Sequence, residues 1–243
     1  MYLAIHKSLK PYENNPREAI VLDIGGNIGW FTLISASLGH RVLTFEPNRI
    51  NNMKHCESLQ LNGWLHDDRK DNLVELYESG VGDSHGKVLK LFHFPGRRNP
   101  GKATFNAARR GKGTGQVVGS FTLLSLDQIA EDKGWFESRP RITFVKVDVE
   151  GFELNVMRGA KTMIDARLIS NVVFKFKPQI HEEDLENKKL LKNLIDNNYV
   201  LYKYGGANGP HDLFEQKYNT AEELFKILSE RMTNQNLWWK LRH

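Results

Sequence analysis

A glycine-rich turn between a buried strand and a helix constrains the fold of this chain more than any other stretch. The apolar run at residues 20–22 predicts a buried strand that ends at the carboxylate of Asp23, and the apolar spacing over residues 30–38 predicts a helix. The turn between them holds Gly25, Gly26, Asn27 and Gly29. Such a turn places backbone N–H groups and a helix N-terminus beside a ligand, and glycine lets that ligand approach the main chain.

The spacing of the glycines distinguishes two classes of ligand. A dinucleotide site requires G-x-G-x-x-G, which is absent here, and Asp23 would repel a pyrophosphate. A carboxylate at this place instead suits a ligand with an ammonium group. The predicted strand at residues 41–45 ends at Glu46, about 20 residues after the turn, where doubly wound folds have a ribose-binding carboxylate. This D-x-G-x-N-x-G turn followed by an acid resembles the pattern of class I S-adenosylmethionine (SAM) methyltransferases; the alternative is a purely structural turn.

Further motifs narrow the resemblance to one family. They are Thr-Phe-Glu-Pro at 44–47, Gly-Val-Gly-Asp-Ser-His-Gly at 80–86, Ser-Leu-Asp at 125–127, Val-Lys-Val-Asp-Val-Glu-Gly-Phe-Glu at 145–153 and Arg-Gly-Ala at 158–160. In this order, over about residues 21–178, they resemble the FkbM family of SAM-dependent methyltransferases, most of whose characterised members are O-methyltransferases. The resemblance implies an α/β, Rossmann-like class I methyltransferase fold. Its seven-stranded, mostly parallel sheet would have one reversed strand and helices on both faces.

The same resemblance implies the residues that bind the cofactor, which is SAM. Those expected at the methionine part are Asp23, Gly25, Gly26, Asn27 and Gly29. Glu46 is expected to accept hydrogen bonds from both ribose hydroxyls. The residues expected to border the adenine are Val81, Gly82 and Asp83, although Asp83 could equally be a turn residue.

Asp148 is the first candidate for catalysis, because the predicted strand at residues 144–147 places it at the C-terminal ends of the strands, where the cofactor is expected to bind. Methyl transfer from a sulfonium is an in-line displacement, so the enzyme has to orient a hydroxyl and accept its proton. Lys146 and Glu150 are the next candidates. Lys146 could instead be the ion-pair partner of Asp148, and Glu150 could cap the helix that begins near Phe152.

One residue departs from the family pattern. Lys175 stands where the family usually has a glutamate, and it changes the charge at the acceptor site by two units. Lys175 could serve as a base, or the chain could be a binding module that retains SAM without turnover. His181 and His211 follow late strands and are further candidates for a base.

The net charge of +5 is concentrated in one segment. Residues 95–116 contain six basic side chains and no acid, which leaves the rest of the chain near neutral. We expect a mobile insertion that joins two strands. It could grip the phosphates of RNA, so an RNA 2′-O-methyltransferase is the alternative function. Phe105 is its only aromatic residue, which is too few for base stacking, so we do not expect a nucleic acid as the partner. The resemblance to the FkbM family implies a small-molecule or glycan acceptor instead.

The length of 243 residues fits one methyltransferase domain over residues 1–243, with residues 1–18 as an N-terminal arm or short helix. No apolar run has the length of a membrane span, so we expect a cytoplasmic protein or a domain excised from a membrane-anchored one. An exposed Trp238-Trp239 pair would indicate a homodimer; otherwise the pair packs against the last helix.

A dedicated zinc site is not expected from the sequence. The single cysteine, Cys56, excludes an intramolecular disulfide and a cysteine-based zinc site, and the histidines lack zinc-ligand spacing. A Mg²⁺ ion held by Asp148 and a neighbouring carboxylate remains an open alternative.

Overall fold

The structure, a computed structural model, describes residues 2–64, 72–93, 115–176, 185–206, 209–215, 220, 222–224, 226 and 235–242. The helices are α1 (Tyr2–Leu9), α2 (Trp30–Ser37), α3 (Arg49–Leu61), α4 (Leu126–Asp132), α5 (Trp135–Ser138), α6 (Glu153–Arg158), α7 (Lys161–Asp165) and α9 (Leu185–Asp196). The strands are β1 (Ala19–Ile24), β2 (Arg41–Phe45), β3 (Val74–Tyr77), β4 (Gly80–Val81), β5 (Val88–His93), β6 (Gln116–Leu124), β7 (Arg141–Val147), β8 (Asn171–Phe176), β9 (Tyr199–Gly206), β10 (Gly209–Glu215) and β11 (Gln235–Leu241).

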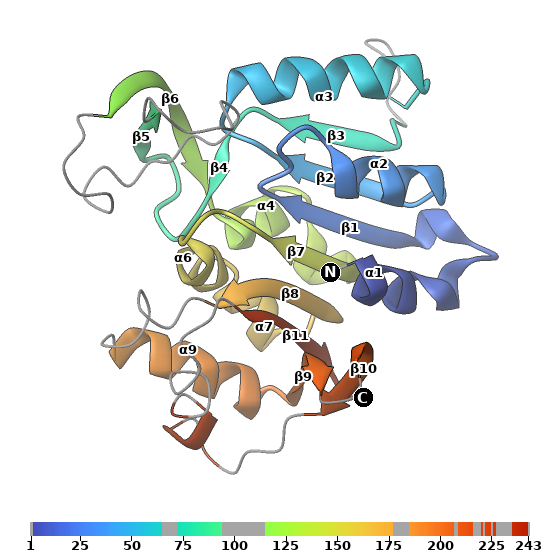
Figure 1. Ribbon diagram of the computed structural model, residues 1–243, viewed down its shortest axis with the longest axis vertical. Helices are drawn as coiled ribbons and strands as arrows, with labels where there is room; N and C mark the ends of the chain where they lie inside the picture. Colours follow the sequence, from blue (N-terminus) through green and yellow to red (C-terminus); the bar gives the residue numbers. More distant parts are fainter. Residues whose placement is uncertain are drawn as a thin grey trace.

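The main sheet has the strand order β10-β9-β11-β8-β7-β1-β2-β3 (Figure 1). Strands β3, β2, β1, β7 and β8 pair in parallel, whereas β11 runs antiparallel to both β8 and β9. In Figure 1 the arrowheads of β1, β2 and β3 point toward one edge of the sheet, and helices α2 and α3 begin at that edge. The chain therefore reverses direction there after each strand, as a doubly wound sheet requires.

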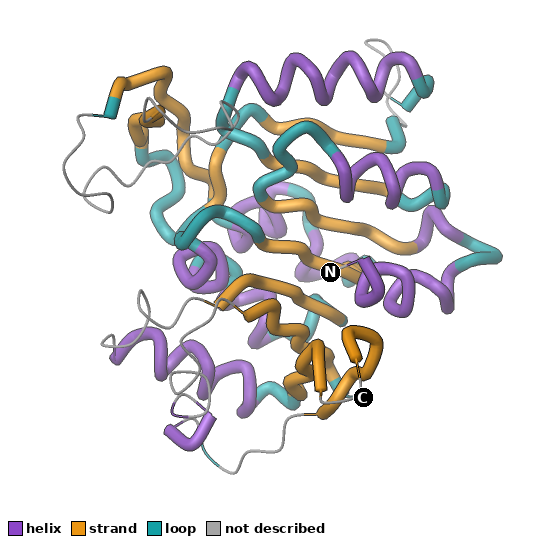
Figure 2. The backbone as a smooth tube through the Cα atoms, in the orientation of Figure 1, coloured by secondary structure: helices purple, strands orange, loops and turns teal. Residues whose placement is uncertain are grey.

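Helices cover both faces of the sheet, and alternation along the buried strands separates two cores. On β1, Ile20 and Leu22 pack into a core with helices α4 to α7 and α9. Val21 faces the other way and packs with residues of α1, α2 and α3. In Figure 2, α1 and α2 lie in front of the strands and α4 lies behind them. Side chains two residues apart share a face of a strand, so the short apolar run of β1 supplies both cores.

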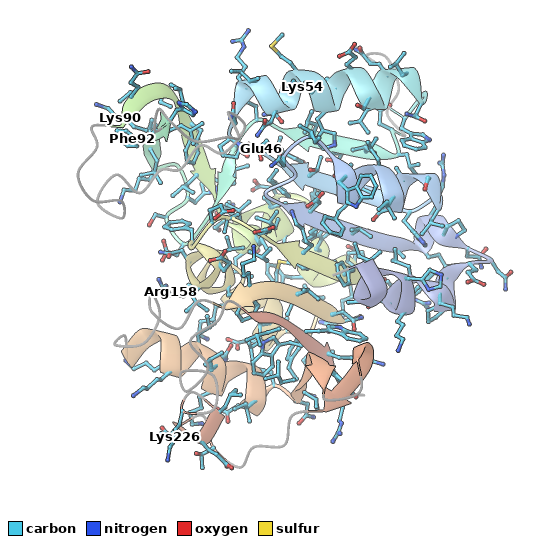
Figure 3. All side chains as sticks on the ribbon, viewed as in Figure 1. Glu46, Lys54, Lys90, Phe92, Arg158 and Lys226 are labelled. Carbon is cyan, nitrogen blue, oxygen red and sulfur yellow. The ribbon has the colours of Figure 1, made fainter. Side chains whose placement is uncertain are left out.

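A second, three-stranded sheet with the order β4-β6-β5 lies at the edge toward which the parallel strands point. Leu91, Phe121 and Leu123 form its small apolar core. Figure 3 shows Glu46 at the end of β2, on the side of the main sheet where β5 carries Lys90 and Phe92. This sheet therefore borders the place where the glycine turn follows β1.

The fold class predicted from the sequence is confirmed, and the sheet has one strand more than predicted. The reversed strand within the seven-stranded order is β11, which runs antiparallel to β8 and β9. Strand β10 is the eighth and pairs with β9 at one side of the sheet. Trp238 and Trp239 lie in β11 and are buried on opposite faces of the sheet, so the pair offers no exposed dimer surface. Trp239 belongs to the core that contains Leu224 and residues of α9.

Two of the described helices begin at a residue whose side chain caps the helix. Asn48 caps α3 by accepting a hydrogen bond from the Ile50 N–H at 3.0 Å, and Ser125 caps α4 by accepting one from the Gln128 N–H at 3.1 Å. Within the predicted N-terminal arm, Ala4 and Ile5 of α1 are fully buried. Most of the basic segment, residues 94–114, lies outside the described residues. None of the described helices combines the length and hydropathy that crossing a bilayer demands.

Replacing Trp239 by alanine should lower the free energy of unfolding by about 3–5 kcal/mol, because the side chain is fully buried in β11 and its removal leaves a cavity. Trp30→Ala is the matched control: that side chain is 67% exposed, and its loss should change the free energy by no more than about 0.5 kcal/mol. Urea denaturation of both variants measures the difference. Equal losses would show that β11 is not the buried strand described here.

Candidate active site

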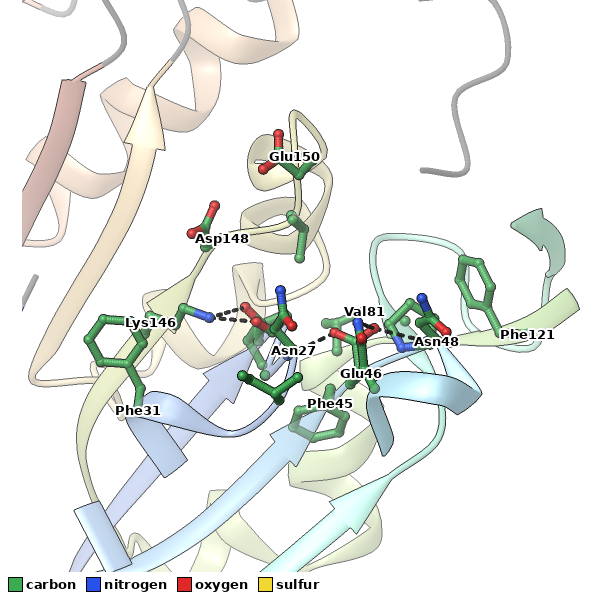
Figure 4. Close-up of a pocket in the computed structure, with 18 of the residues that line it drawn as sticks. Asn27, Phe31, Phe45, Glu46, Asn48, Val81, Phe121, Lys146, Asp148 and Glu150 are labelled. Atoms are coloured by element: carbon green, nitrogen blue, oxygen red, sulfur yellow. Dashed lines mark hydrogen bonds between the residues drawn. The ribbon is translucent and has the colours of Figure 1, made fainter. Parts of the chain in front are cut away.

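A cavity of about 380 Å³ opens where β1, β2 and β7 end (Figure 4). Its lining combines the glycine turn, the end of β2, the segment after β7 and the three-stranded sheet β4-β6-β5, which we call the outlying sheet. The described lining residues are Ile24, Gly25, Gly26, Asn27, Ile28, Trp30, Phe31, Phe45, Glu46, Pro47, Asn48, Asn51, Gly80, Val81, Leu91, Phe121, Leu123, Lys146, Asp148, Val149 and Glu150. Most of the predicted site residues are therefore brought together in one cavity.

Glu46 is held in place by hydrogen bonds to both of its carboxylate oxygens. Oε1 accepts from the backbone N–H of Asn48 at 2.9 Å and from the Asn51 side chain at 3.3 Å, and Oε2 accepts from the backbone N–H of Asn27 at 2.9 Å. Burial raises the pKa of Glu46, and the bonds from Asn48 and Asn27 oppose that rise. The carboxylate thus has a single orientation, and of its roughly four acceptor positions one, on Oε2, is left for a hydroxyl donor of a ligand.

Asp23 does not line the cavity but lies beneath the turn. Its side chain is fully buried, accepts a hydrogen bond from the Thr32 hydroxyl at 2.8 Å and forms an ion pair with Lys146 Nζ at 2.8 Å. Asp23 and Lys146 are direct neighbours in the parallel pairing of β1 and β7. Lys146 also donates to the carbonyl oxygens of Gly25 at 2.6 Å and Ile24 at 3.4 Å. This pair therefore fixes the path of the turn from below.

The turn packs so closely on its surroundings that a Cβ atom has no room. A Cβ at Gly25 would lie 2.2 Å from the carbonyl oxygen of Asp148, and one at Gly29 would lie 2.4 Å from the His55 ring. Gly25, Asn27 and Gly29 also adopt positive φ angles of 80°, 53° and 94°, which favour glycine or asparagine. Gly29 does not line the cavity, so the structural demand on it comes from His55.

His55 lies beneath the glycine turn and was not identified from the sequence. It lies on α3, is fully buried under Gly26 and Gly29, and neither ring nitrogen has a hydrogen-bond partner within the described part of the chain. Burial lowers the pKa of His55, and Lys146 lowers it further against the opposing effect of Asp23. The neutral imidazole therefore supports the turn as a flat, tightly packed surface.

Asp148 lines the cavity and pairs with Lys175, not with Lys146. Its Oδ1 lies 3.4 Å from Lys175 Nζ, whereas Lys146 is directed at Asp23 and the turn. The predicted Lys146–Asp148 pair is therefore not formed. Glu150 also lines the cavity, with a positive φ of 53°, and Figure 4 shows Asp148 and Glu150 on the same side of it.

Of residues 81–83, which we expect to border the adenine, Val81 lines the cavity, whereas Gly82 and Asp83 do not. Asp83 instead accepts hydrogen bonds from Asn155 at 3.1 Å and from Arg158 Nε at 3.2 Å. Asp83 thus joins the outlying sheet to α6 and does not face the cavity.

The apolar lining residues of the outlying sheet's long strands were not found from the sequence. They are Leu91 of β5 and Phe121 and Leu123 of β6. Figure 4 shows Phe121 at the opposite end from Lys146 and Phe31, with Glu46 between them. Only the pairing of β5 with β6 brings them here.

Two further expectations concern a histidine base and a metal ion. His181 and the side chain of His211 lie outside the described residues. Within the described ranges, no group of three histidine, cysteine, aspartate or glutamate side chains is arranged to hold a metal ion.

Stability should fall as the pH is lowered from about 7.5 to about 5.5, because the unfolded chain binds a proton on His55 more readily than the folded chain does. The folded-state pKa of His55 lies below its ordinary value of 6.5, so its contribution is complete above that value and is lost below it. Urea midpoints should fall less steeply for His55→Gln than for the wild type. Identical slopes for His55→Gln and the wild type would contradict this role of His55.

Comparison with known proteins gives the family. Residues 23–201 match the methyltransferase FkbM domain. "Methyltransferase 1" of Beauveria bassiana (strain ARSEF 2860) is 26% identical over 157 residues, which cover 59% of this chain and 59% of that protein.

Similar solved structures include a precorrin-6y C5,15-methyltransferase from Geobacter metallireducens GS-15 (12% identity, TM-score 0.41, 98% of this chain and 86% of that one). An rRNA methylase from Streptococcus thermophilus is 14% identical, with a TM-score of 0.44 over 98% of this chain and 97% of that one. We draw no conclusion from these structural likenesses. The family match spans well over half of the chain, and the chain therefore belongs to the FkbM methyltransferase family.

Proposed function

We propose that this chain is a SAM-dependent O-methyltransferase that methylates a hydroxyl group of a sugar, in a glycan or in a glycosylated metabolite. The observation that supports the proposal most is that Glu46 and Asp148 line one cavity with the glycine turn between them. Glu46 suits the recognition of a ribose, and Asp148 suits an acceptor hydroxyl. The family is one of methyltransferases, and the sugar hydroxyl is our inference from the resemblance described above.

The residues around the cavity fit SAM. Both oxygens of Glu46 are oriented by N–H donors. Oε2 retains a lone pair for one ribose hydroxyl, and the second hydroxyl would replace the 3.3 Å bond from Asn51 at Oε1. The apolar walls at Val81 and Phe121 suit a planar base, and no side chain caps the N-terminus of α2 at Gly29. The N–H groups of that first helical turn are suited to a carboxylate. We infer that Asp23 acts on the cofactor through the turn rather than by direct contact.

SAM, when bound, supplies a methyl group whose bond to sulfur breaks as the bond to the acceptor oxygen forms, and the electron pair stays on sulfur. In this mechanism Asp148 accepts the hydrogen bond of the acceptor hydroxyl and takes up its proton. Lys146 keeps the turn in position, so that the nucleophile and the methyl group are aligned before reaction. Glu150 lies on the same side of the cavity as Asp148, and we assign it to the binding of the acceptor.

Calorimetry should show binding of SAM and S-adenosylhomocysteine but not of NAD or ATP. Glu46→Ala should weaken SAM binding about tenfold or more, because two charge-assisted bonds to the ribose are lost. Asp148→Asn should retain SAM binding and lower kcat about a hundredfold or more, because the proton acceptor is lost. Binding of NAD in place of SAM would refute the proposal.

A methyl-transfer screen over monosaccharides, glycans and RNA identifies the acceptor class. Transfer to RNA alone, with salt-dependent binding, would replace the sugar by a nucleic acid and point to the basic residues 95–116. SAM binding without transfer to any of them would instead favour a binding module.

Gly29→Ala should lower SAM affinity about tenfold or more, because the new Cβ would collide with His55 and displace the turn. Gly86→Ala is a matched control: Gly86 has a similar φ of +80°, but nothing lies within 4 Å of the position of its Cβ. The control should change SAM affinity no more than about twofold. His55→Ala in the Gly29→Ala background should restore part of the affinity. Equal effects of the two glycine variants would show that backbone strain, not contact with His55, governs the turn.

A further inference from the structure

Strand register places one lysine beside the carboxylate that we assign to the acceptor. In the parallel pairing of β7 with β8, Lys146 lies opposite Val173 and Val147 lies opposite Phe174. The next step along both strands brings Asp148 beside Lys175, and their Oδ1 and Nζ atoms are 3.4 Å apart. Their contact therefore follows from the topology of the central sheet and not from a surface encounter of long side chains.

Lys146 and Lys175, near the C-terminal ends of β7 and β8, differ in exposure and in the groups that they contact. Lys146 is 3% exposed and is engaged by Asp23 and by the carbonyl oxygens of the turn. Lys175 is 27% exposed, and Asp148, its partner among the described residues, is 33% exposed. A separation of 3.4 Å is at the long end of a hydrogen bond, so this pair is loose and both groups can reach a ligand.

The chemistry of the Asp148–Lys175 pair specifies what an acceptor should present. A carboxylate only accepts hydrogen bonds, and an ammonium group only donates them. Asp148 therefore takes a hydroxyl that carries a hydrogen, whereas Lys175 takes an oxygen lone pair next to it. The two oxygens of a gauche vicinal diol lie about 2.8 Å apart, close to a hydrogen-bond length, which matches adjacent acceptor and donor groups.

We infer that the acceptor is a carbohydrate vicinal diol: Asp148 binds the hydroxyl that is methylated, and Lys175 binds the oxygen on the neighbouring carbon. This inference rests on the proposed function and specifies the acceptor further. Lys175 is then a specificity-determining residue, and a hydroxyl without an oxygen on the adjacent carbon is a poor substrate. A polar site that loses one of its ligand's hydrogen-bonding groups discriminates strongly against that ligand.

The test compares the methyl α-glycosides of glucose, mannose and galactose with their 2-, 3- and 4-deoxy analogues. Methyl transfer from labelled SAM gives kcat/KM, and saturation-transfer NMR with the S-adenosylhomocysteine-loaded protein gives binding. For the preferred glycoside, removing the oxygen next to the methylated hydroxyl should lower kcat/KM about tenfold, the effect of one charge-assisted hydrogen bond.

Lys175→Met should reduce that preference for the diol to about twofold or less, and Lys175→Arg, which keeps a cationic donor, should retain part of it. Lys161→Met is the matched control. Lys161 forms an exposed ion pair with Asp165 within α7, and its replacement should leave the preference intact. A preference that persists in Lys175→Met, or no preference in the wild type, would overturn the inference.

Failure of the inference can be told apart from failure of the proposed function. A chain that does not bind SAM in calorimetry is not the proposed enzyme. A chain that binds SAM, but for which no glycoside gives a stronger NMR signal than its deoxy analogue, contradicts only the assignment of Asp148 and Lys175 to a diol.

Discussion

The buried ion pair of Asp23 and Lys146 is the interaction on which the site depends. It joins the two central strands at the point where β1 ends, and both charges are removed from water. Such a pair is tolerated only when the remaining hydrogen-bonding groups are satisfied, and here Thr32 and the carbonyl oxygen of Gly25 do so. Loss of either charge would strand the other at a cost of about 3–5 kcal/mol. The pair therefore holds the sheet together and determines the course of the glycine turn.

The turn is shaped by what lies beneath it as much as by a ligand above it. His55 fills the space under Gly29, and the carbonyl oxygen of Asp148 fills the space beside Gly25. The second contact joins the glycine turn to the segment that carries Asp148. A displacement of the turn would thus move both halves of the site, which explains why close packing, rather than flexibility, suits an in-line transfer.

Charge is distributed unevenly around the cavity. Each of Asp23 and Asp148 has its own lysine, whereas Glu46 is stabilised by N–H donors. Among the described lining residues, the side chains that the outlying sheet contributes are apolar, and Phe121 lies at the opposite end of the cavity from Lys146. The cavity therefore has a polar edge formed by the central strands and an apolar end formed by an insertion between them.

The sequence by itself determined the first strands and the polar residues at their ends, because these depend on local patterns: the apolar run of β1, the glycine turn and the acid that ends β2. Only the tertiary structure decided the partners. Period-two alternation does not say which strand lies next to which, so the pairing of Lys146 with Asp23 and of Lys175 with Asp148 could not be read from the sequence. The ion pair of Asp83 with Arg158 could not be read from the sequence either. The same is true of Trp238 and Trp239, which lie in β11 between β8 and β9. Contacts between residues far apart in the chain are set by packing and register, and no local pattern encodes them.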